Sequence, residues 1–339
     1  LLVAGLGLWG LYATYAADLP SVEALRAYRP ATVTTVYAAD GTTILGEIYE
    51  ERRYVLPLDR IPKHVQDAFV SAEDASFWDH GGIDFMGIVR AMGRNLREGR
   101  VAQGGSTITQ QVAKKFLLTD DRSFERKIKE AILSWRIEST YSKEHILFLY
   151  LNEIFLGSQA YGVEAASRTF FGKGVDELSI AEAAVIAGLP PRPSEYNPHS
   201  RIQAALKRQQ YVLDQMVRTG AITAEAADAA RAEEIRIVPR TNTFREVAPH
   251  FTEHARRWLV DNFGEDKVLH EGLQVYTTAD PHLQLHAQEV VTRRAREMDM
   301  QLGFRREGLE HLSDPTAIAE RAAAHEAAMR KAWVAARDP

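Results

Sequence analysis

The chain has 339 residues, a formal net charge of -5 and no cysteine. Without cysteine, a disulfide framework and a thiolate zinc site are both excluded. The acidic balance, and the absence of an Arg- and Lys-rich patch with interleaved aromatic residues, argue against nucleic-acid binding.

The first 17 residues form an uncharged apolar run, LLVAGLGLWGLYATYAA. Because a membrane-spanning helix takes about 20 residues, we expect residues 1–17 to be the outer part of a transmembrane anchor. A signal peptide is the alternative, but the basic region and the A-x-A site that it needs are missing. Residues 18–58 mix proline, charge and strand-like stretches, with a hairpin signal at Asp40-Gly41. We predict a stalk or linker there.

Residues 59–235 are predicted to be mainly helical, because apolar residues recur at spacings of three and four. The clearest such segments are Ser142 to Leu156, Leu178 to Gly188 and Arg201 to Gly220. From residue 236 to 339 the pattern changes to a second, α/β module. Its predicted elements are a strand at EIRIVP, a helix over Ala248 to Phe263, a strand at GLQVYTTAD, a helix over His282 to Met298 and a surface helix over 314–336.

Two adjacent acids, Glu73 and Asp74, follow the apolar stripe of a predicted helix. Since Glu73 lies four residues after Phe69, it falls at the edge of the inward-facing side. Burial raises the pKa of a carboxyl toward the range in which the carboxylate accepts a proton near neutral pH. Taken alone, the pair is equally consistent with a helix-ending acid that binds a surface cation.

The segment GGSTITQQ, Gly104 to Gln111, predicts a helix start. Its glycines permit a tight turn, and Ser106 or Thr107 can cap the helix. The N–H groups of such an end, with neutral donors such as Thr107, Gln110 and Gln111, suit sugar hydroxyls and phosphate oxygens. A plain capped helix remains the alternative.

A further helix is predicted for DDRSFERKIKE, Asp120 to Glu130. Arg122, Arg126 and Glu130 are four residues apart and share one helix face, with Lys127 beside them. Alone, this pattern is typical of a solvated salt-bridge ladder. Combined with the two preceding segments, it supplies the cations and carboxylates that would suit a pyrophosphate.

These segments resemble the peptidoglycan glycosyltransferase domain of class A penicillin-binding proteins and their single-domain relatives. The family signatures EDxxFxxHxGxD, GGSTxTQQ, RKxxE and KxxIxxxYLN all occur in order, at Glu73 to Asp84, Gly104 to Gln111, Arg126 to Glu130 and Lys143 to Asn152. Gly157, the run from Tyr161 to Lys173 and the run from Ala187 to Pro198 are also similar. One departure is Lys115, which stands where the family usually has Asn.

The segment from Gly272 to Gln284 resembles the entry into the transpeptidase region of the same proteins. A penicillin-sensitive transpeptidase needs SxxK, SxN and KTG motifs, and none occurs in this chain. The resemblance therefore implies polymerase chemistry without cross-linking chemistry. We expect a natural protein with this C-terminal region to continue beyond Pro339.

The resemblance implies a lysozyme-like, mainly α glycosyltransferase domain over residues 59–235. The implied reaction polymerises lipid II into glycan strands by inverting transfer, with undecaprenyl pyrophosphate as the leaving group. Glu73 is the implied base for the acceptor 4-hydroxyl, and Glu130 is a second catalytic carboxylate that orients or assists. Lys114, Arg122 and Arg126 would stabilise the leaving-group charge.

The implied substrate-binding residues are Asp74, Phe77, His80, Thr107, Gln111, Lys114, Arg122, Arg126 and Lys127. Whether a divalent cation, Mg²⁺ or Mn²⁺, shares the pyrophosphate charge is left open, and its ligands are unknown. The implied partners are lipid II, the growing glycan chain and the cytoplasmic membrane, with other cell-wall synthesis proteins as open candidates and no nucleic acid. We therefore expect a single-pass protein of the bacterial inner membrane with its catalytic domain on the periplasmic side.

Two alternatives stay open. A lysozyme-like hydrolase or lytic transglycosylase would also use a glutamate of raised pKa, but it has little need of three cations near a leaving group. A non-catalytic membrane-anchored scaffold would retain the fold alone, and the presence of both family carboxylates argues against it.

Overall fold

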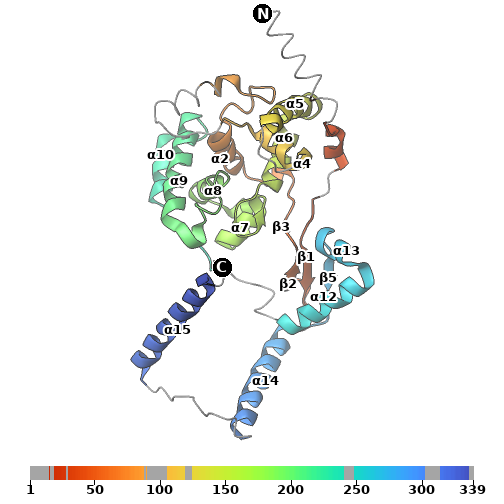
Figure 1. Ribbon diagram of the computed structural model, residues 1–339, viewed down its shortest axis with the longest axis vertical. Coiled ribbons are helices and arrows are strands. Elements are labelled where there is room, and N and C mark those ends of the chain that lie inside the picture. Colours follow the sequence, from red (N-terminus) through yellow and green to blue (C-terminus); the bar gives the residue numbers. More distant parts are fainter. Residues whose placement is uncertain are drawn as a thin grey trace, which may run out of the picture. The chain divides into compact units, whose positions relative to one another are not determined.

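A computed structural model describes residues 15, 19–27, 30–87, 89, 105–118, 124–239, 248–301 and 314–335 (Figure 1). It divides the chain into two units, residues 1–281 and 282–339. The predicted anchor at 1–17 lies outside the described residues, except for Tyr15. Within the described part, no helix combines the length and the apolar character needed to cross a membrane.

The middle of the chain is helical, as its hydrophobic periodicity predicted. The helices are η1 (Val22–Ala27), η2 (Leu58–Arg60), α2 (Lys63–Glu73), α4 (Ile108–Leu117), α5 (Phe124–Thr140), α6 (Lys143–Glu153), α7 (Val163–Phe171), η3 (Val175–Glu177), α8 (Ile180–Ala187), α9 (Pro198–Arg218) and α10 (Ala224–Ala232). Local sequence sets their starts. Ser142 caps α6, Ser179 and Glu182 form a capping box on α8, and Asn197 caps α9 ahead of a proline in its first turn.

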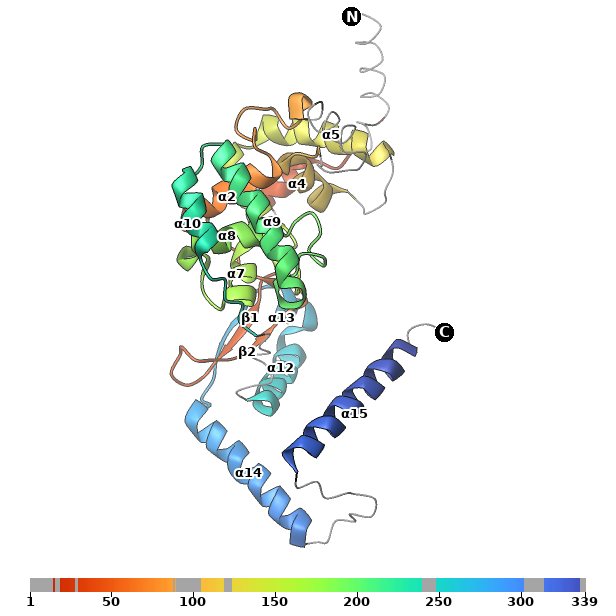
Figure 2. The ribbon, with the colours of Figure 1, turned by 90° about the vertical axis from the view of Figure 1, so that its left-hand side faces the viewer.

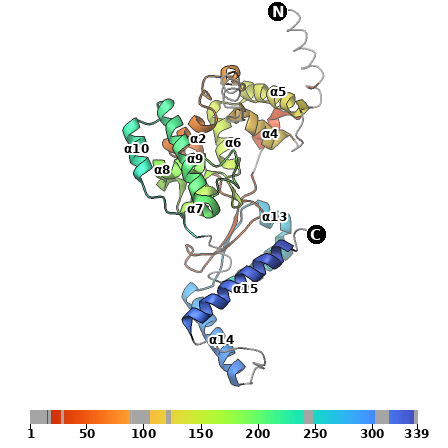
Figure 3. The same cartoon turned by 60° about the vertical axis from the view of Figure 1, so that its left-hand side comes forward.

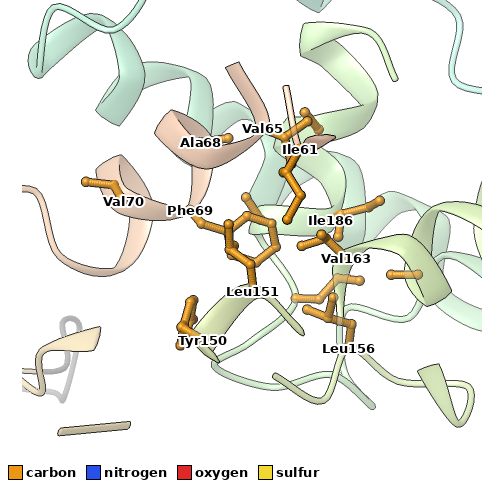
Figure 4. Packing of buried hydrophobic residues seen from close by; sticks show 14 of the residues in the cluster. Ile61, Val65, Ala68, Phe69, Val70, Tyr150, Leu151, Leu156, Val163 and Ile186 are labelled. Atoms are coloured by element: carbon orange, nitrogen blue, oxygen red, sulfur yellow. The ribbon is translucent and has the colours of Figure 1, made fainter. Parts of the chain in front are cut away.

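Helix α2 is held in place by apolar burial on several sides. It packs against α8 and α9, which lie beside it in two views (Figures 1 and 2). Its Phe69 is fully buried and lies near Leu151 of α6, with Val163 and Ile186 in the same cluster (Figure 4). Burial of one such side chain contributes about 1.5 to 3 kcal/mol. The end of α2, which carries Glu73, therefore has a fixed position.

Two segments that are far apart in the sequence form one small sheet. Strands β1 (Thr34–Tyr37) and β2 (Ile44–Ile48) make the predicted antiparallel hairpin around Asp40-Gly41, and β5 (Gln274–Tyr276) pairs in parallel with β1. Helices α12 (Pro249–Phe263) and α13 (Glu265–His270) complete this part. Its own apolar cluster consists of Val36, Ala38, Leu45, Ile48, Ala248, Leu259 and Val268.

A second sheet joins the chain near residue 50 to the helical part. Strand β3 (Arg52–Arg53) pairs in parallel with β4 (Ala160–Tyr161). Arg53 is buried, and its Nε atom lies 3.0 Å from Oε1 of Glu153 at the end of α6. Removing one partner of a buried ion pair leaves an uncompensated charge, so this pair fixes β3 on α6.

One sequence prediction is wrong. Residues 234–239, EIRIVP, form no strand. The Val238 N–H donates to the Phe170 carbonyl at 2.9 Å, and a Cβ on Gly172 would lie 3.2 Å from Val238 Cγ1. The apolar residues of this segment therefore cover the end of α7 instead of pairing with another strand.

The C-terminal unit contains helices α14 (Pro281–Gln301) and α15 (Pro315–Ala335). Both confirm the helices predicted from the sequence. No residue of α14 is buried, which agrees with a polar, surface type of helix.

Candidate active site

Glu73 is the last residue of α2 and faces the start of α4. The Gln111 Nε2 atom donates to Glu73 Oε2 at 2.9 Å. The residue as a whole keeps partial exposure, but enough protein surrounds its carboxyl that desolvation raises its pKa above the ordinary 4.5. The Gln111 hydrogen bond and the charge of Arg208 lower this pKa, and neighbouring Asp74 raises it. The net rise is the property expected of a general base.

The neighbouring Asp74 is buried in a network that links α2 to α4. The Ile108 N–H, in the first turn of α4, donates to Asp74 Oδ2 at 2.9 Å. The His80 Nε2 atom lies 3.0 Å from both carboxylate oxygens of Asp74. Since the Gly82 N–H donates to His80 Nδ1 at 3.1 Å, the hydrogen-bond pattern assigns the proton to Nε2. Asp74 and His80 thus anchor the helix that carries Gln111.

Gly82 lets this loop approach α5 closely. Its φ is +95°, and a Cβ atom there would lie 2.8 Å from the Ser134 carbonyl oxygen. Both the backbone conformation and the space require glycine. The Gly82 carbonyl accepts the Thr107 hydroxyl at 2.7 Å, so the loop is tied to the start of α4 as well.

The polar residues before α4 divide into two roles. Thr107 and Gln110 form a capping box, with bonds of 3.1 Å and 3.0 Å between each side chain and the other's N–H. Both residues are buried, so the structure uses these predicted donors to build the helix end. Gln111 is the donor that reaches the base, and Ser106 accepts from Lys127 at 3.0 Å. Substrate binding by Thr107 stays a prediction.

Helix α5 brings a buried acid together with two cations. Glu130 is buried, its Oε1 lies 3.0 Å from Arg126 Nε, and its Oε2 accepts from Lys127. The Arg126 contact has ion-pair distance without hydrogen-bond geometry. Two cations against one carboxylate leave a net positive charge at this place. Glu130 therefore balances part of the charge of Arg126 and Lys127, and its catalytic role stays a prediction.

Helix α4 lies against α5, as the contacts and the views in Figures 1 and 3 agree. Lys114 is exposed and lies one turn after Gln111, so the two share a face of α4. Lys115 instead lies 5.1 Å from the Tyr161 ring centroid. The predicted cation Arg122 lies outside the described residues.

Phe77 belongs to the predicted substrate-binding residues and lies next to His80. Phe77 is fully buried, packs edge-on against His80, and has the Lys143 ammonium 4.4 Å from its ring centroid.

In the described ranges, no group of three or more His, Asp or Glu side chains could hold a metal ion. The acids Asp74 and Glu130 are already engaged, Asp74 by the Ile108 N–H and His80, and Glu130 by Arg126 and Lys127.

Two side chains that interact electrostatically with Glu73, Tyr150 and Arg208, were not among the residues predicted from the sequence. Tyr150 is buried, and its hydroxyl has no hydrogen-bond partner in the described part of the chain. Burial, with added effects from Glu73 and Asp74, raises its pKa well above 10. Arg208 of α9 is the cation that acts on Glu73. Tyr150 lies inside the YLN signature, which was a usable signal, whereas Arg208 lies in none of the four signatures.

The chain is similar to a known protein family and to several curated proteins. The family model described as Transglycosylase matches residues 41–217. Penicillin-binding protein 1A of Neisseria flavescens is 42% identical over 296 residues, which cover 87% of this chain and 37% of that protein. The Aquifex aeolicus (strain VF5) protein of the same name is 44% identical over 273 residues, covering 80% and 37%. The Escherichia coli (strain K12) protein is 40% identical over 298 residues, covering 88% and 35%.

A solved structure is also similar. The crystal structure of penicillin-binding protein 1A from Haemophilus influenzae shares 28% identity and a TM-score of 0.47, over 86% of this chain and 34% of that one. This chain spans 37% or less of the length of the three curated relatives described above.

Proposed function

The chain belongs to the transglycosylase family, and from that membership and its site we propose that it polymerises lipid II into peptidoglycan glycan strands. The observation that carries the proposal is the buried carboxylate of Glu73, held by Gln111, on an α2–α4 frame that also carries Lys114 and adjoins the cations of α5. The mainly helical domain is consistent with the lysozyme-like fold that the sequence suggested.

In the proposed reaction, Glu73 removes the proton from the 4-hydroxyl of an acceptor sugar. The hydroxyl oxygen forms a bond to C1 of the donor sugar, and the bond from C1 to the pyrophosphate oxygen breaks. Attack opposite the leaving group inverts C1. Glu73 ends protonated, and the electron pair leaves with undecaprenyl pyrophosphate.

Charge development explains the need for cations. The leaving pyrophosphate gains negative charge in the transition state, so positioned cations stabilise it more than they stabilise the bound substrate. Among the residues that the structure describes, Lys114 and Arg126 are the candidates for this role, and Lys127 contributes through its exposed ammonium. Glu130 holds Arg126 and Lys127 in place.

Incubation with labelled lipid II tests the function. The proposal expects ladders of long glycan strands. Shortening of added peptidoglycan without ladder formation would establish a hydrolase instead, and binding without either product would establish a scaffold.

We also propose that the domain works at the outer face of the cytoplasmic membrane, through exposed apolar residues at a helix start that follows the His80 to Asp84 segment. Phe85 and Met86 are 72% and 71% exposed, and Val89 is 64% exposed. The Gly87 N–H donates to Asp84 Oδ1 at 2.7 Å, so Asp84 caps the start of the helical segment that carries them. Exposed apolar residues grouped in this way are typical of interfacial elements.

Replacing both Phe85 and Met86 by Asp should reduce liposome binding of a chain that begins at Asp18 by about 10-fold or more, because each buried apolar side chain contributes about 1.5 to 3 kcal/mol. Co-sedimentation with phosphatidylglycerol–phosphatidylethanolamine vesicles measures this. The matched control replaces two exposed apolar residues of α12, Trp258 and Phe263, by Asp. Equal losses in both double variants, or no vesicle binding by the parent chain at low salt, would contradict this membrane assignment.

A further inference from the structure

Arg208 is held in place by Tyr211 of its own helix and by Gly188 and Tyr196, which belong to the run Ala187 to Pro198. Its stem passes so close to Gly188 that a Cβ atom on that glycine would lie 2.8 Å from Arg208 Cγ. Its guanidinium carbon lies 4.0 Å from the ring centroid of Tyr211 and 5.9 Å from that of Tyr196. A planar guanidinium stacks favourably on such rings, so its charge has a defined place.

The guanidinium belongs to a helix that packs against α2, whose last residue is Glu73. Helices α9 and α2 pack together (Figure 2), and Arg208 acts electrostatically on Glu73. Its Nε atom is buried and has no hydrogen-bond partner among the described residues. A half-buried cation without a partner at Nε is unfavourable unless nearby negative charge compensates it.

We propose that Arg208 is a positioning residue for the proposed glycosyl transfer: held by Gly188, Tyr196 and Tyr211, it sets a fixed positive charge beside Glu73 and keeps this base ionised in its buried setting. The inference rests on the proposed function, because it assigns Arg208 a role only through Glu73. Desolvation disfavours the carboxylate, and a nearby opposite charge favours it. The balance of the two decides how much base is available near neutral pH.

The other groups that contact Glu73 or act on its pKa are not cations. Asp74, the residue that follows it, is an acid and pairs with His80. Gln111 on α4 is a neutral donor, and Tyr150 on α6 is a phenol whose raised pKa keeps it neutral. The acid of α8, Glu182, pairs with Lys173 at the opposite end of that helix from Gly188. Of the groups that act on the pKa of Glu73, Arg208 is the cation.

The pH dependence of polymerisation by Arg208→Gln tests the proposal. Without the cation, the pKa of Glu73 rises further, so the acid limb of kcat/KM should move to higher pH by about one unit, in line with the effect of a nearby charge. Near the limb this is about a 10-fold loss, which shrinks as the pH rises. Arg208→Lys, which keeps the charge, should retain the wild-type limb to within about half of that shift.

Lys207→Gln is the matched control, because it removes the same charge from the adjacent, exposed position of α9. Its acid limb should not move. A folded Arg208→Gln variant with the wild-type limb would overturn the inference, as would an equal shift in Lys207→Gln. If the wild-type chain makes no glycan, the proposed function fails, which is a different result from an unshifted limb in an active enzyme.

The absence of cysteine in the chain permits a second arm that does not depend on Arg208→Gln. Arg208→Cys can be alkylated with 2-bromoethylamine, which restores a cation, or with iodoacetamide, which leaves a neutral group. The inference expects only the aminoethylated protein to recover the wild-type limb. The same acid limb for both adducts would show a structural role instead. So would unfolding of the two neutral forms, Arg208→Gln and the iodoacetamide adduct, while Arg208→Lys folds.

Discussion

Glu73→Gln is expected to lower polymerisation by about 100-fold or more, the usual contribution of a general base, while the fold and lipid II binding persist. The amide has the size of the carboxylate and can still pair with Gln111, but it cannot accept the acceptor proton. Steady-state rates with labelled lipid II, with binding measured separately, check this result. An activity above a tenth of the wild-type value would contradict the role of Glu73.

Glu73→Gln should keep or raise the stability of the fold while it lowers activity. Because burial raises the pKa of Glu73 above 4.5, the folded state binds this proton more tightly than the unfolded chain does. The stability linked to it is therefore present at low pH and is lost as the pH rises through the folded-state pKa. At pH 7 the neutral Gln variant should melt at the wild-type temperature or above it. The control Glu144→Gln, on an exposed residue of α6, should change neither quantity.

Lys114→Ala is expected to lower turnover by about 100-fold, since a charge aimed at a developing oxyanion is worth roughly 3 kcal/mol. Its effect on stability should stay below about 1 kcal/mol, the usual range for an exposed cation. A phosphoglycolipid that mimics the growing chain should also bind the variant more weakly, whereas neutral oligosaccharides should compete poorly with it. Rates, inhibitor titration and thermal melts separate these effects.

Lys115→Ala provides the control on the next residue. Lys115 is also exposed but contacts the ring of Tyr161, so its removal should leave turnover within about two-fold of wild type, as for most surface substitutions. Equal losses in the two variants would point to a general charge effect. Normal polymerisation by Lys114→Ala would remove this lysine from the leaving-group site.

Local patterns in the sequence were sufficient to predict much of the helical part. Helical spacing, together with caps such as Ser142, Ser179 and Asn197, marks helix positions that the structure confirms. The family signatures also brought Glu73 and Gln111 together, although 38 residues separate them. Their side-chain bond supports grouping the two segments in one site.

Long-range partners were not predictable in this way. A strand pattern does not name its neighbour, so the parallel pairing of Thr35 with Gln274 could not be foreseen. The segment around Val238 has a strand-like composition, but the Val238 N–H binds the Phe170 carbonyl of α7 and the Val238 side chain lies against Gly172 at the end of that helix. Arg208 belongs to an ordinary amphipathic pattern, and only its packing against Gly188 and Tyr211 distinguishes it from other surface cations.

The most direct test of the central claim is to measure polyprenyl pyrophosphate release against the number of new glycosidic bonds, using lipid II labelled in both the sugar and the lipid. Polymerisation by this chain predicts one undecaprenyl pyrophosphate for each new bond, with both signals abolished together in Glu73→Gln. Bond cleavage in existing glycan without pyrophosphate release, or pyrophosphate release without glycan growth, would contradict the account.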